Sequence, residues 1–478
     1  MEVKTAAFKH GAEIALADPQ LQWALTRVMR HFDEAREEAI AEITPQRWEE
    51  LRERGRAIKR HTLKNLDYYL ELLVRRVGEA GGVVHFARNA GEVRRIVVRL
   101  ARARGVRSAV KSKSMISEEV GLNHALEAVG VEVAETDLGE YIIQLAEETP
   151  FHIVAPAMHK SKEQVADLFA RRLGGPRREA IPELAQRARE ILRPKFLAAD
   201  MGISGVNFAV AETGTVVLVT NEGNGQLSTS LPPIHVALMG MEKVVPTLED
   251  MAIFLRLLGR SATGQRLTSY TTFITGPRRA DDEDGPEEFH LVIVDNGRSN
   301  LLRDPGLREA LYCIRCGACL NICPVYRKVG GHAYGWVYTG PIGSVVTPMM
   351  VGLERAKELP YASSLCGACR DVRPLKIDIP HMLLKLRGRV AERFGQRRSQ
   401  VSPLERLLMK GWYLVVRDSR SFALAHKLGS RLQWPLAQGG RIRHIPVPPL
   451  SAWTRQRDFP ALAPKTFHRI WRERLGRG

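Results

Sequence analysis

The chain contains only six cysteines among its 478 residues, and none lies outside the segment from Cys313 to Cys369. It has no run approaching 18 consecutive apolar residues, which argues against a transmembrane helix. Its N-terminus lacks a basic segment followed by an apolar one, so no secretory signal is expected. The whole chain has 44% hydrophobic and 26% charged residues, which is the composition of a soluble globular protein.

The cysteines form one complete and one incomplete copy of a spacing motif. The complete copy reads Cys313-x2-Cys316-x2-Cys319-x3-Cys323-Pro324. This is the spacing of bacterial ferredoxins, in which three thiolates bind one cubane cluster and the fourth binds a second cluster. A structural zinc site usually has two well-separated Cys-x2-Cys pairs, and cysteines three residues apart rarely meet disulfide geometry. The motif therefore favours iron–sulfur clusters, and cysteines used in this way indicate a reducing compartment, the cytoplasm.

The incomplete copy lacks two of the eight thiolates that two such clusters need. It spans residues 363–374, with Ser363 at the first cysteine position and Arg373 at the last. A serine oxygen can bind iron, whereas a guanidinium stays protonated and offers only donors. The first cluster then has only three cysteine ligands. Its fourth iron is either open to solvent, substrate or another side chain, or lost to leave a 3Fe form; alternatively, the whole cluster is absent. Crosswise binding gives Cys313, Cys316 and Cys319 to the first cluster, and Cys323, Cys366 and Cys369, with Ser363, to the second.

Positive charge is concentrated at the C-terminal end. From Leu375 onward the chain carries 22 of its 71 Lys/Arg but only 6 of its 53 Asp/Glu, so nearly all of the net charge of +18 falls there. Such a region attracts an acidic partner subunit, an anionic membrane surface or nucleic acid. No nucleic-acid-binding motif accompanies the charge. We therefore expect a protein partner, with peripheral membrane contact as an alternative and no nucleic acid.

Periodicity divides the chain into four parts. Residues 1–78 show helical spacing of apolar residues, and residues 79–300 alternate strands with helices, which predicts an α/β fold. Phe151–Pro156 reads as one of the strands, and the later β-rich segments are expected to extend the sheet as antiparallel strands, giving a mixed sheet. Residues 301–395 form a mainly helical cysteine domain, and residues 396–478 form a basic extension broken by Pro and Gly.

Several segments resemble the lactate-utilisation protein B family. They are KSKSM (111–115), ETDLGEYIIQL (135–145), HIVAPAMHK (152–160), AVAETGTVVLVTNEGNG (209–225) and PPIHVALMGMEKVVP (232–246), followed by the ferredoxin motif. The resemblance implies an α/β domain similar to those of sugar-phosphate isomerases and CoA transferases, two 4Fe–4S clusters on the six cysteines, and a role with two partner proteins in oxidising L-lactate to pyruvate. The family pattern has a cysteine where this chain has Arg373.

Substrate candidates follow from the places where polar residues meet strand ends. Lys111 and Lys113 come after a strand, a common position for ligand contacts in open α/β sheets. Turns between strands place backbone amides where an anion can bind, and a histidine can move a proton; each of these residue types is more often purely structural. The candidates are Lys111, Lys113, Asn221, Glu222, Asn224 and His235, and no catalytic residue is assigned.

The function that we predict is an iron–sulfur electron-transfer subunit of a cytoplasmic, multi-protein L-lactate-oxidising system, working beside a second iron–sulfur protein. The alternative is a metabolite-binding iron–sulfur sensor without turnover of its own. A hydro-lyase that uses an open iron as a Lewis acid is less favoured. Electron flow from lactate distinguishes the first function from the second.

Overall fold

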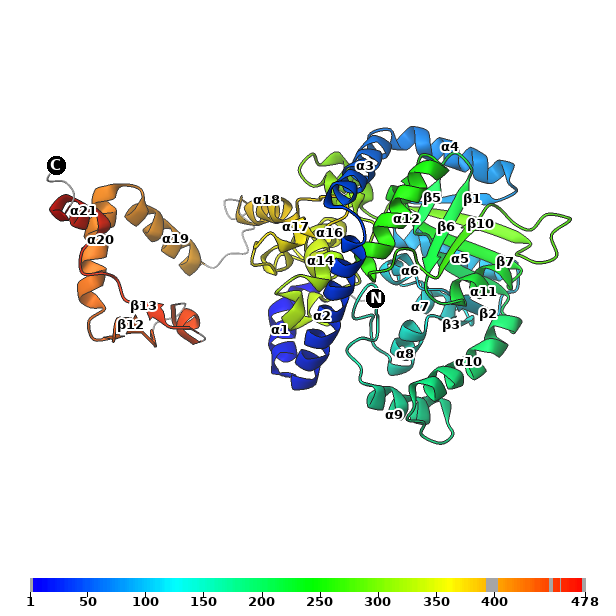
Figure 1. Cartoon of the computed structure of the whole chain (residues 1–478), viewed down its shortest axis with the longest axis horizontal. Coiled ribbons are helices and arrows are strands. Elements are labelled where there is room, and N and C mark those ends of the chain that lie inside the picture. The colour runs from blue at the N-terminus through cyan, green and yellow to red at the C-terminus, as the bar shows by residue number, and fades with distance from the viewer. Residues whose placement is uncertain (1–2, 393–402, 447–449, 456, 475–478) are drawn as a thin grey trace. The chain divides into compact units, whose positions relative to one another are not determined.

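A computed structural model of the chain describes residues 3–392, 403–446, 450–455 and 457–474 (Figure 1). Its contacts divide the chain into two compact units, Met1–Ala391 and Glu392–Gly478. The boundary expected between residues 395 and 396 lies outside the described residues, and the boundaries at 78/79 and 300/301 stay predictions. All six cysteines belong to the first unit.

A six-stranded parallel sheet forms the centre of the first unit (Figure 1), with the strand order β1-β10-β7-β4-β2-β3. Every neighbouring pair is parallel, as expected where helices connect successive strands. This confirms the α/β fold. The strands are β1 (Val83–Ala87), β2 (Ser108–Lys111), β3 (Glu132–Glu135), β4 (Met201–Gly205), β7 (Ile234–Gly240) and β10 (Glu288–Val294).

A second, smaller sheet covers one face of the parallel sheet. Alternate side chains of β7 and β10, including Met239 and Ile293, pack with Val216 and Leu218 of this smaller sheet. Of the β-rich segments that we expected to extend the central sheet as antiparallel strands, β7 and β10 join it as parallel strands. The others form a sheet of their own, because both faces of the central strands are apolar and need cover. Its order is β8 (Val244–Val245), β5 (Phe208–Val210), β6 (Thr215–Thr220) and β9 (Tyr270–Ile274), with antiparallel β5–β6 and β6–β9 pairs.

Helices cover the rest of the parallel sheet. The intervening side chains of the same strands, such as Val236 and Val292, pack against Val97 and Leu126 on the opposite face. Helices near β2 and β3 close that end of the sheet. The helices are α5 (Ala90–Ala103), α6 (Met115–Val120), α7 (Leu122–Glu127), α8 (Leu138–Ala146), α9 (Lys162–Leu173), α10 (Ile181–Ala198) and α11 (Asn224–Ser230). Helix α12 (Leu248–Ala262) instead contacts β5 of the smaller sheet.

The N-terminal helices pack against the cysteine-bearing segment. Two of them begin at side-chain caps, where Asp18 and Thr44 accept hydrogen bonds from backbone amides and a proline follows. The second helix contacts α12 as well as the helices of the first cysteine run. The four are α1 (Phe8–Ala17), α2 (Pro19–Ala41), α3 (Pro45–Lys64) and α4 (Leu66–Glu79).

Short helices and turns make up the cysteine-bearing segment, and their apolar side chains share one core with the N-terminal helices and α12. This agrees with the expectation of a mainly helical segment around the cysteines. The helices are α13 (Arg298–Arg303), α14 (Ala318–Asn321), α15 (Tyr326–Val329), α16 (Gly340–Val351), α17 (Ala368–Asp371) and α18 (Ile379–Glu392), with 3-10 turns at Arg308–Tyr312, His332–Tyr334 and Leu359–Tyr361.

The second unit contains two helices in contact with each other and a small antiparallel sheet. Large apolar side chains remain exposed on both helices, among them Trp412 and Leu428. Among the described residues, no helix of either unit combines the length and apolar character needed to cross a bilayer. The elements are α19 (Pro403–Val416), α20 (Ser419–Leu432), β11 (Ala437–Gln438), β12 (Arg441–Ile442), β13 (Phe459–Pro460) and α21 (Phe467–Arg474).

The segment Phe151–Pro156 is not the strand that its apolar sequence predicts. Its backbone forms bends and turns and lies against the first cysteine run. The carbonyl of Phe151 accepts a hydrogen bond from the Tyr326 hydroxyl at 2.8 Å, and His152 Nε2 lies 3.1 Å from Asn321 Oδ1. These side-chain contacts take the place of the backbone hydrogen bonds to a neighbouring strand that a β-strand would make.

Candidate functional site

The two cysteine runs fold into the same turn. Gly317 and Gly367 both adopt left-handed backbone, with φ of 78° and 87°, and each caps the short helix that follows it, α14 or α17. The residue two positions earlier is also left-handed in both runs, Arg315 with φ of 63° and Leu365 with φ of 56°. Such conformations are rare away from glycine. The match at two equivalent pairs of positions shows an internal structural repeat, and α14 contacts α17.

Ser363 occupies the position of Cys313 in this repeat. The backbone N–H of Arg315 donates to Cys313 Sγ at 3.4 Å, and the N–H of Leu365 donates to Ser363 Oγ at 3.1 Å. The serine oxygen is therefore presented by the same local hydrogen bond as the cysteine sulfur. Its role as a ligand stays a prediction.

Arg373 occupies the position of Cys323. Its side chain is only 3% exposed, and none of its three guanidinium nitrogens has a hydrogen-bond partner among the described residues. Burial lowers the pKa of the guanidinium, but thiolate charge at Cys319, Cys313 and Cys369 outweighs burial and raises it. A buried cation is costly unless negative charge lies beside it, so this pocket fits a group that carries negative charge.

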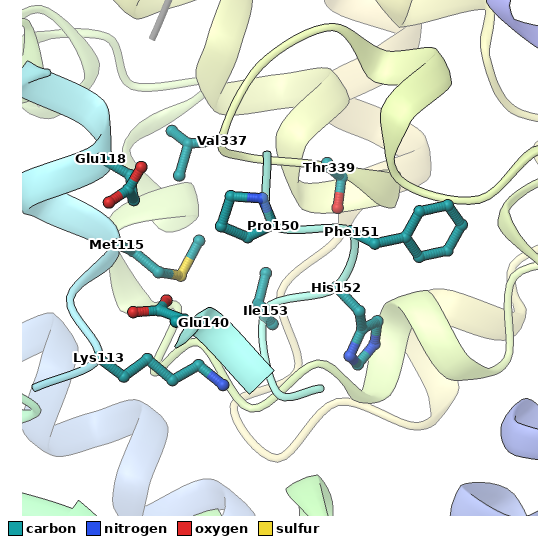
Figure 2. Close-up of a pocket in the computed structure, with 10 residues that line it drawn as sticks. All are labelled: Lys113, Met115, Glu118, Glu140, Pro150, Phe151, His152, Ile153, Val337 and Thr339. Atoms are coloured by element: carbon teal, nitrogen blue, oxygen red, sulfur yellow. The ribbon is translucent and has the colours of Figure 1, made fainter. Parts of the chain in front are cut away.

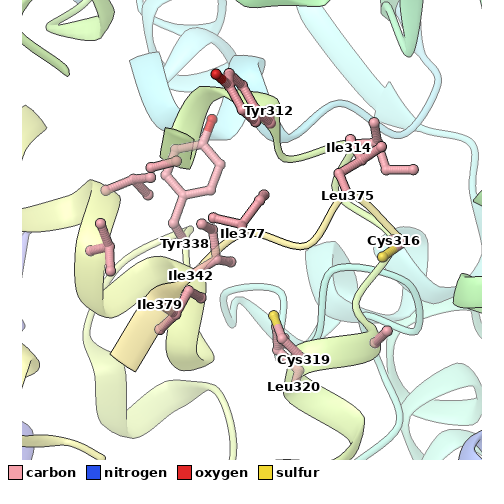
Figure 3. Packing of buried hydrophobic residues seen from close by; sticks show 14 of the residues in the cluster. Tyr312, Ile314, Cys316, Cys319, Leu320, Tyr338, Ile342, Leu375, Ile377 and Ile379 are labelled. Atoms are coloured by element: carbon pink, nitrogen blue, oxygen red, sulfur yellow. The ribbon is translucent and has the colours of Figure 1, made fainter. Parts of the chain in front are cut away.

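An apolar cavity brings the first three cysteines together with Arg373. It is lined by Cys313, Cys316 and Cys319, by Arg373, and by aliphatic side chains that include Ile342 and Leu375. Figure 3 shows Cys316 and Cys319 among these aliphatic neighbours. The three thiols of one run and residue 373 of the other therefore meet, as crosswise binding requires.

Burial makes these thiols poor acids on their own. It raises the pKa of Cys316 and Cys369 to about 12 and that of Cys323 to about 11. Thiolate charge at Cys319 and Cys366 adds to the shift at Cys323, so Cys323 lies near the second run. Thiols of this kind are held as thiolates by metal binding. The donor set and its surroundings thus fit iron–sulfur clusters.

Arginines from the N-terminal helices hold the second turn in place. Arg52 donates to the carbonyls of Arg373 and Asp371 at 2.9 and 3.0 Å, and Arg36 donates to the carbonyl of Val372 at 3.0 Å. From their sequence we expected these helices only to pack. No spacing motif marks the arginines, because their partners are backbone carbonyls more than 300 residues away in the chain.

A larger cavity of about 420 Å³ lies between the α/β core and the first cysteine run. Four substrate candidates, Lys113, Asn221, Glu222 and Asn224, line it. Lys113 also lines a small neighbouring pocket (Figure 2) and donates to the carbonyl of Val154 at 2.6 Å. Burial, followed by the charge of nearby Asp137, raises the pKa of Glu222.

The other two substrate candidates do not line this cavity. Lys111 is fully buried, and its ammonium lies 2.6 Å from carboxylate oxygens of both Glu118 and Glu135. His235 is buried within β7, where its Nε2 lies 2.8 Å from Ser204 Oγ, and burial lowers its pKa to about 3. Both therefore have structural partners, which lie in neighbouring strands and, for Glu118, in α6.

A buried charge network joins this cavity to the cysteine segment. Arg298 pairs with both oxygens of Glu119 at 2.9 and 2.8 Å and with Glu242 at 2.8 Å. Tyr338 also donates to Glu119, at 2.5 Å, and its ring lies 4.3 Å below the Arg315 guanidinium. The sequence did not predict this network, because its residues are far apart in the chain. Only the position of Arg315 between two cysteines indicated that one of them could be functional.

Three family models match consecutive parts of the chain. The LUD domain matches residues 70–294, the 4Fe-4S dicluster domain residues 309–377, and the lactate utilisation protein B C-terminal region residues 385–475. Together these matches cover most of the chain, with the dicluster match spanning both cysteine runs.

Curated relatives match over nearly the whole length. A lactate utilization protein B of Geobacillus sp. (strain WCH70) is 47% identical over 475 residues, 99% of this chain and 98% of the relative. The protein of the same name from Geobacillus kaustophilus is 49% identical, over 89% of this chain and 88% of its own. That of Bacillus subtilis (strain 168) is 46% identical, over 96% and 95%.

Proposed function

This chain belongs to the lactate utilization protein B family, and from that premise we propose that it is the iron–sulfur electron-transfer component of a multi-protein system that oxidises L-lactate to pyruvate. That oxidation releases two electrons and two protons. Iron–sulfur clusters supply one-electron transfer at potentials that the protein sets. The observation that carries the proposal is the repeated turn, which presents the cysteines on two matching loops whose short helices, α14 and α17, are in contact.

The proposed ligands follow the crosswise arrangement. The first group has three thiolates, with Arg373 where the fourth would be, and the second has three thiolates and the Ser363 oxygen. The cavity that contains the first group and Arg373 supports this division. The first group accordingly holds a labile cluster, and the second holds a stable one. The first group is Cys313, Cys316 and Cys319, and the second is Cys323, Cys366 and Cys369.

Exposure differs between the two groups in a way that suits transfer to another protein. Each group has two buried thiols, but the third is half-buried Cys313 in the first group and exposed Cys366 in the second. The second group therefore offers a partner an approach from solvent. The proposed partners are the other lactate-utilisation subunits, including a second iron–sulfur protein, and the basic C-terminal region supports docking of an acidic protein surface.

The test is reduction of this protein by lactate. The chain is purified without oxygen, mixed with the other subunits and L-lactate, and followed by loss of cluster absorbance. We expect bleaching only when lactate and the partners are both present, and loss of that bleaching in Cys369→Ser. D-lactate serves as the matched control. A protein that carries clusters, binds a metabolite and is never reduced would instead support the sensor function.

A further inference from the structure

One end of the larger cavity carries more positive than negative charge. Arg315 lines this end, and its side chain is 11% exposed. Its Nη1 is buried without a hydrogen-bond partner among the described residues, and its Nη2 lies 4.0 Å from Glu242 Oε1, beyond hydrogen-bond range. Glu242 Oε1 likewise has no hydrogen-bond partner there. The Arg315 guanidinium can therefore still bind an anion.

The carboxylates nearby are already used by other groups. Glu119 binds Arg298 through both oxygens and also accepts from Tyr338. Glu242 binds Arg298 through its other oxygen, Oε2. Both acids are almost fully buried, and a buried carboxylate that is already paired has little capacity to neutralise a further cation.

Lys243 adds a second cation at the same end. It lines the cavity, and no hydrogen bond or ion pair of its ammonium is found within the described part of the chain. Burial lowers its pKa to about 8; among the surrounding charges, Glu242 and Cys313 oppose this shift, and Arg315 and Arg298 add to it. A lysine destabilised in this way gains from an anion beside it.

The charges can be counted directly. Four cations, Lys59, Lys243, Arg298 and Arg315, lie around three negative groups, which are the carboxylates of Glu119 and Glu242 and the Cys313 thiolate of the proposed first cluster. Lys59 donates to the carbonyl of Glu242 and is buried. Even with Lys59 partly neutral, since burial lowers its pKa to about 7, positive charge exceeds negative charge.

We propose that this end of the cavity binds the carboxylate of a small organic acid, with Arg315 and Lys243 as its charged partners. An arginine binds a carboxylate through two parallel hydrogen bonds, and a lysine adds a point charge. The polar residues that line the remainder, Asn221, Asn224 and Asp137, suit a hydroxyl or oxo group. The proposal rests on the proposed function for the identity of the acid, L-lactate or its product pyruvate.

The proposed site includes a residue of the loop that carries the first cysteine group. Arg315 lies between Cys313 and Cys316 in the chain, and its amide donates to Cys313 Sγ. A bound acid would thus contact the loop that carries the first cysteine group. This placement assigns the substrate to the present chain, rather than to a partner subunit alone.

The test measures binding of L-lactate and pyruvate to the full, cluster-containing chain by calorimetry, without partner subunits. We expect both acids to bind and the neutral amide of lactate not to bind. Lys243→Gln and Arg315→Gln should each weaken binding by at least about tenfold, the loss of one charged hydrogen bond. Lys162→Gln removes an exposed lysine outside the cavity and should leave binding unchanged.

Other measurements keep the outcomes apart. Arg315→Lys retains the charge and should recover part of the affinity lost in Arg315→Gln, provided that iron content and circular dichroism match the wild type. Absence of binding, or binding that Lys243→Gln leaves unchanged, overturns the proposed site. If lactate still reduces the clusters through the partners in that case, the electron-transfer function stands without it. Binding to a chain that lactate never reduces leaves the site standing and refutes the electron-transfer function.

Discussion

Replacing Arg373 by cysteine should complete the first cysteine group. The backbone at residue 373 already follows the turn that presents Cys323 in the other run, with equivalent amide-to-carbonyl hydrogen bonds. Its side chain lines the cavity that contains the first three cysteines. Arg373→Cys therefore supplies a fourth thiol without a change of fold, and it removes a buried guanidinium that has no hydrogen-bond partner among the described residues.

The expected size of the effect is one iron per chain. A three-thiolate cubane loses its unbound iron on mild oxidation, so the wild-type chain should fall from about eight irons to about seven and show a 3Fe signal by electron paramagnetic resonance. The variant, with four thiolates around the cluster, should keep about eight irons under the same treatment. Iron and acid-labile sulfide are measured before and after brief exposure to ferricyanide.

Two matched variants define the control. Arg370→Cys places a thiol on the exposed face of the same turn and should leave the iron loss unchanged. Ser363→Cys alters the second group and should not protect the first. If the wild type keeps all its iron, or if Arg373→Cys loses iron as the wild type does, the crosswise division of the cysteines is wrong.

Three further predictions concern the cysteine turn and the cavity. Arg298→Met removes the arginine that pairs with two buried carboxylates, Glu119 and Glu242, and should lower the free energy of unfolding by about 3–5 kcal/mol. The same change at exposed Arg172 should cost at most about 1 kcal/mol; urea unfolding followed by circular dichroism measures both. Gly317→Ala forces a left-handed residue to carry a Cβ 3.1 Å from a valine methyl and should cost about 1–2 kcal/mol and lower iron content. Gly388→Ala, with open space around the new Cβ, should cost nothing in either measurement. Affinity for L-lactate should be constant below pH 7 and fall as the pH rises through about 8, because Lys243 loses its proton there; a flat calorimetric profile from pH 6 to 9 would exclude this lysine as a partner of the acid.

Local patterns were sufficient for much of the fold. The strands around Val84 and Val236 show apolar runs bounded by turn residues, and Ser161 with Gln164 forms the capping box that their spacing predicts. The cysteine groups follow from spacing as well, because the turn is built within a few residues. Lys113 reaches the cavity because it directly follows β2.

Long-range contacts account for what sequence reasoning missed. Phe151–Pro156 has the composition of a strand, but its polar groups are satisfied by Tyr326 and Asn321, about 170 residues later. Lys111 is a polar residue at the end of a strand, where a ligand contact is common. In the structure, however, two glutamates from other elements pair with it in the interior. Neither partner choice is encoded in the local sequence, since both depend on which elements the fold brings together.

Metal and sulfide analysis of the anaerobically purified wild-type chain, with electron paramagnetic resonance before and after dithionite, tests most directly the claim that the two matching turns hold iron–sulfur clusters. We predict about eight sulfides per chain, with about eight irons, or about seven where the first cluster has lost its unbound iron, and a signal from reduced clusters after dithionite. A content of about four irons per chain would mean that the first cluster is absent and that the protein holds a single cluster. Zinc without sulfide would contradict the account as a whole.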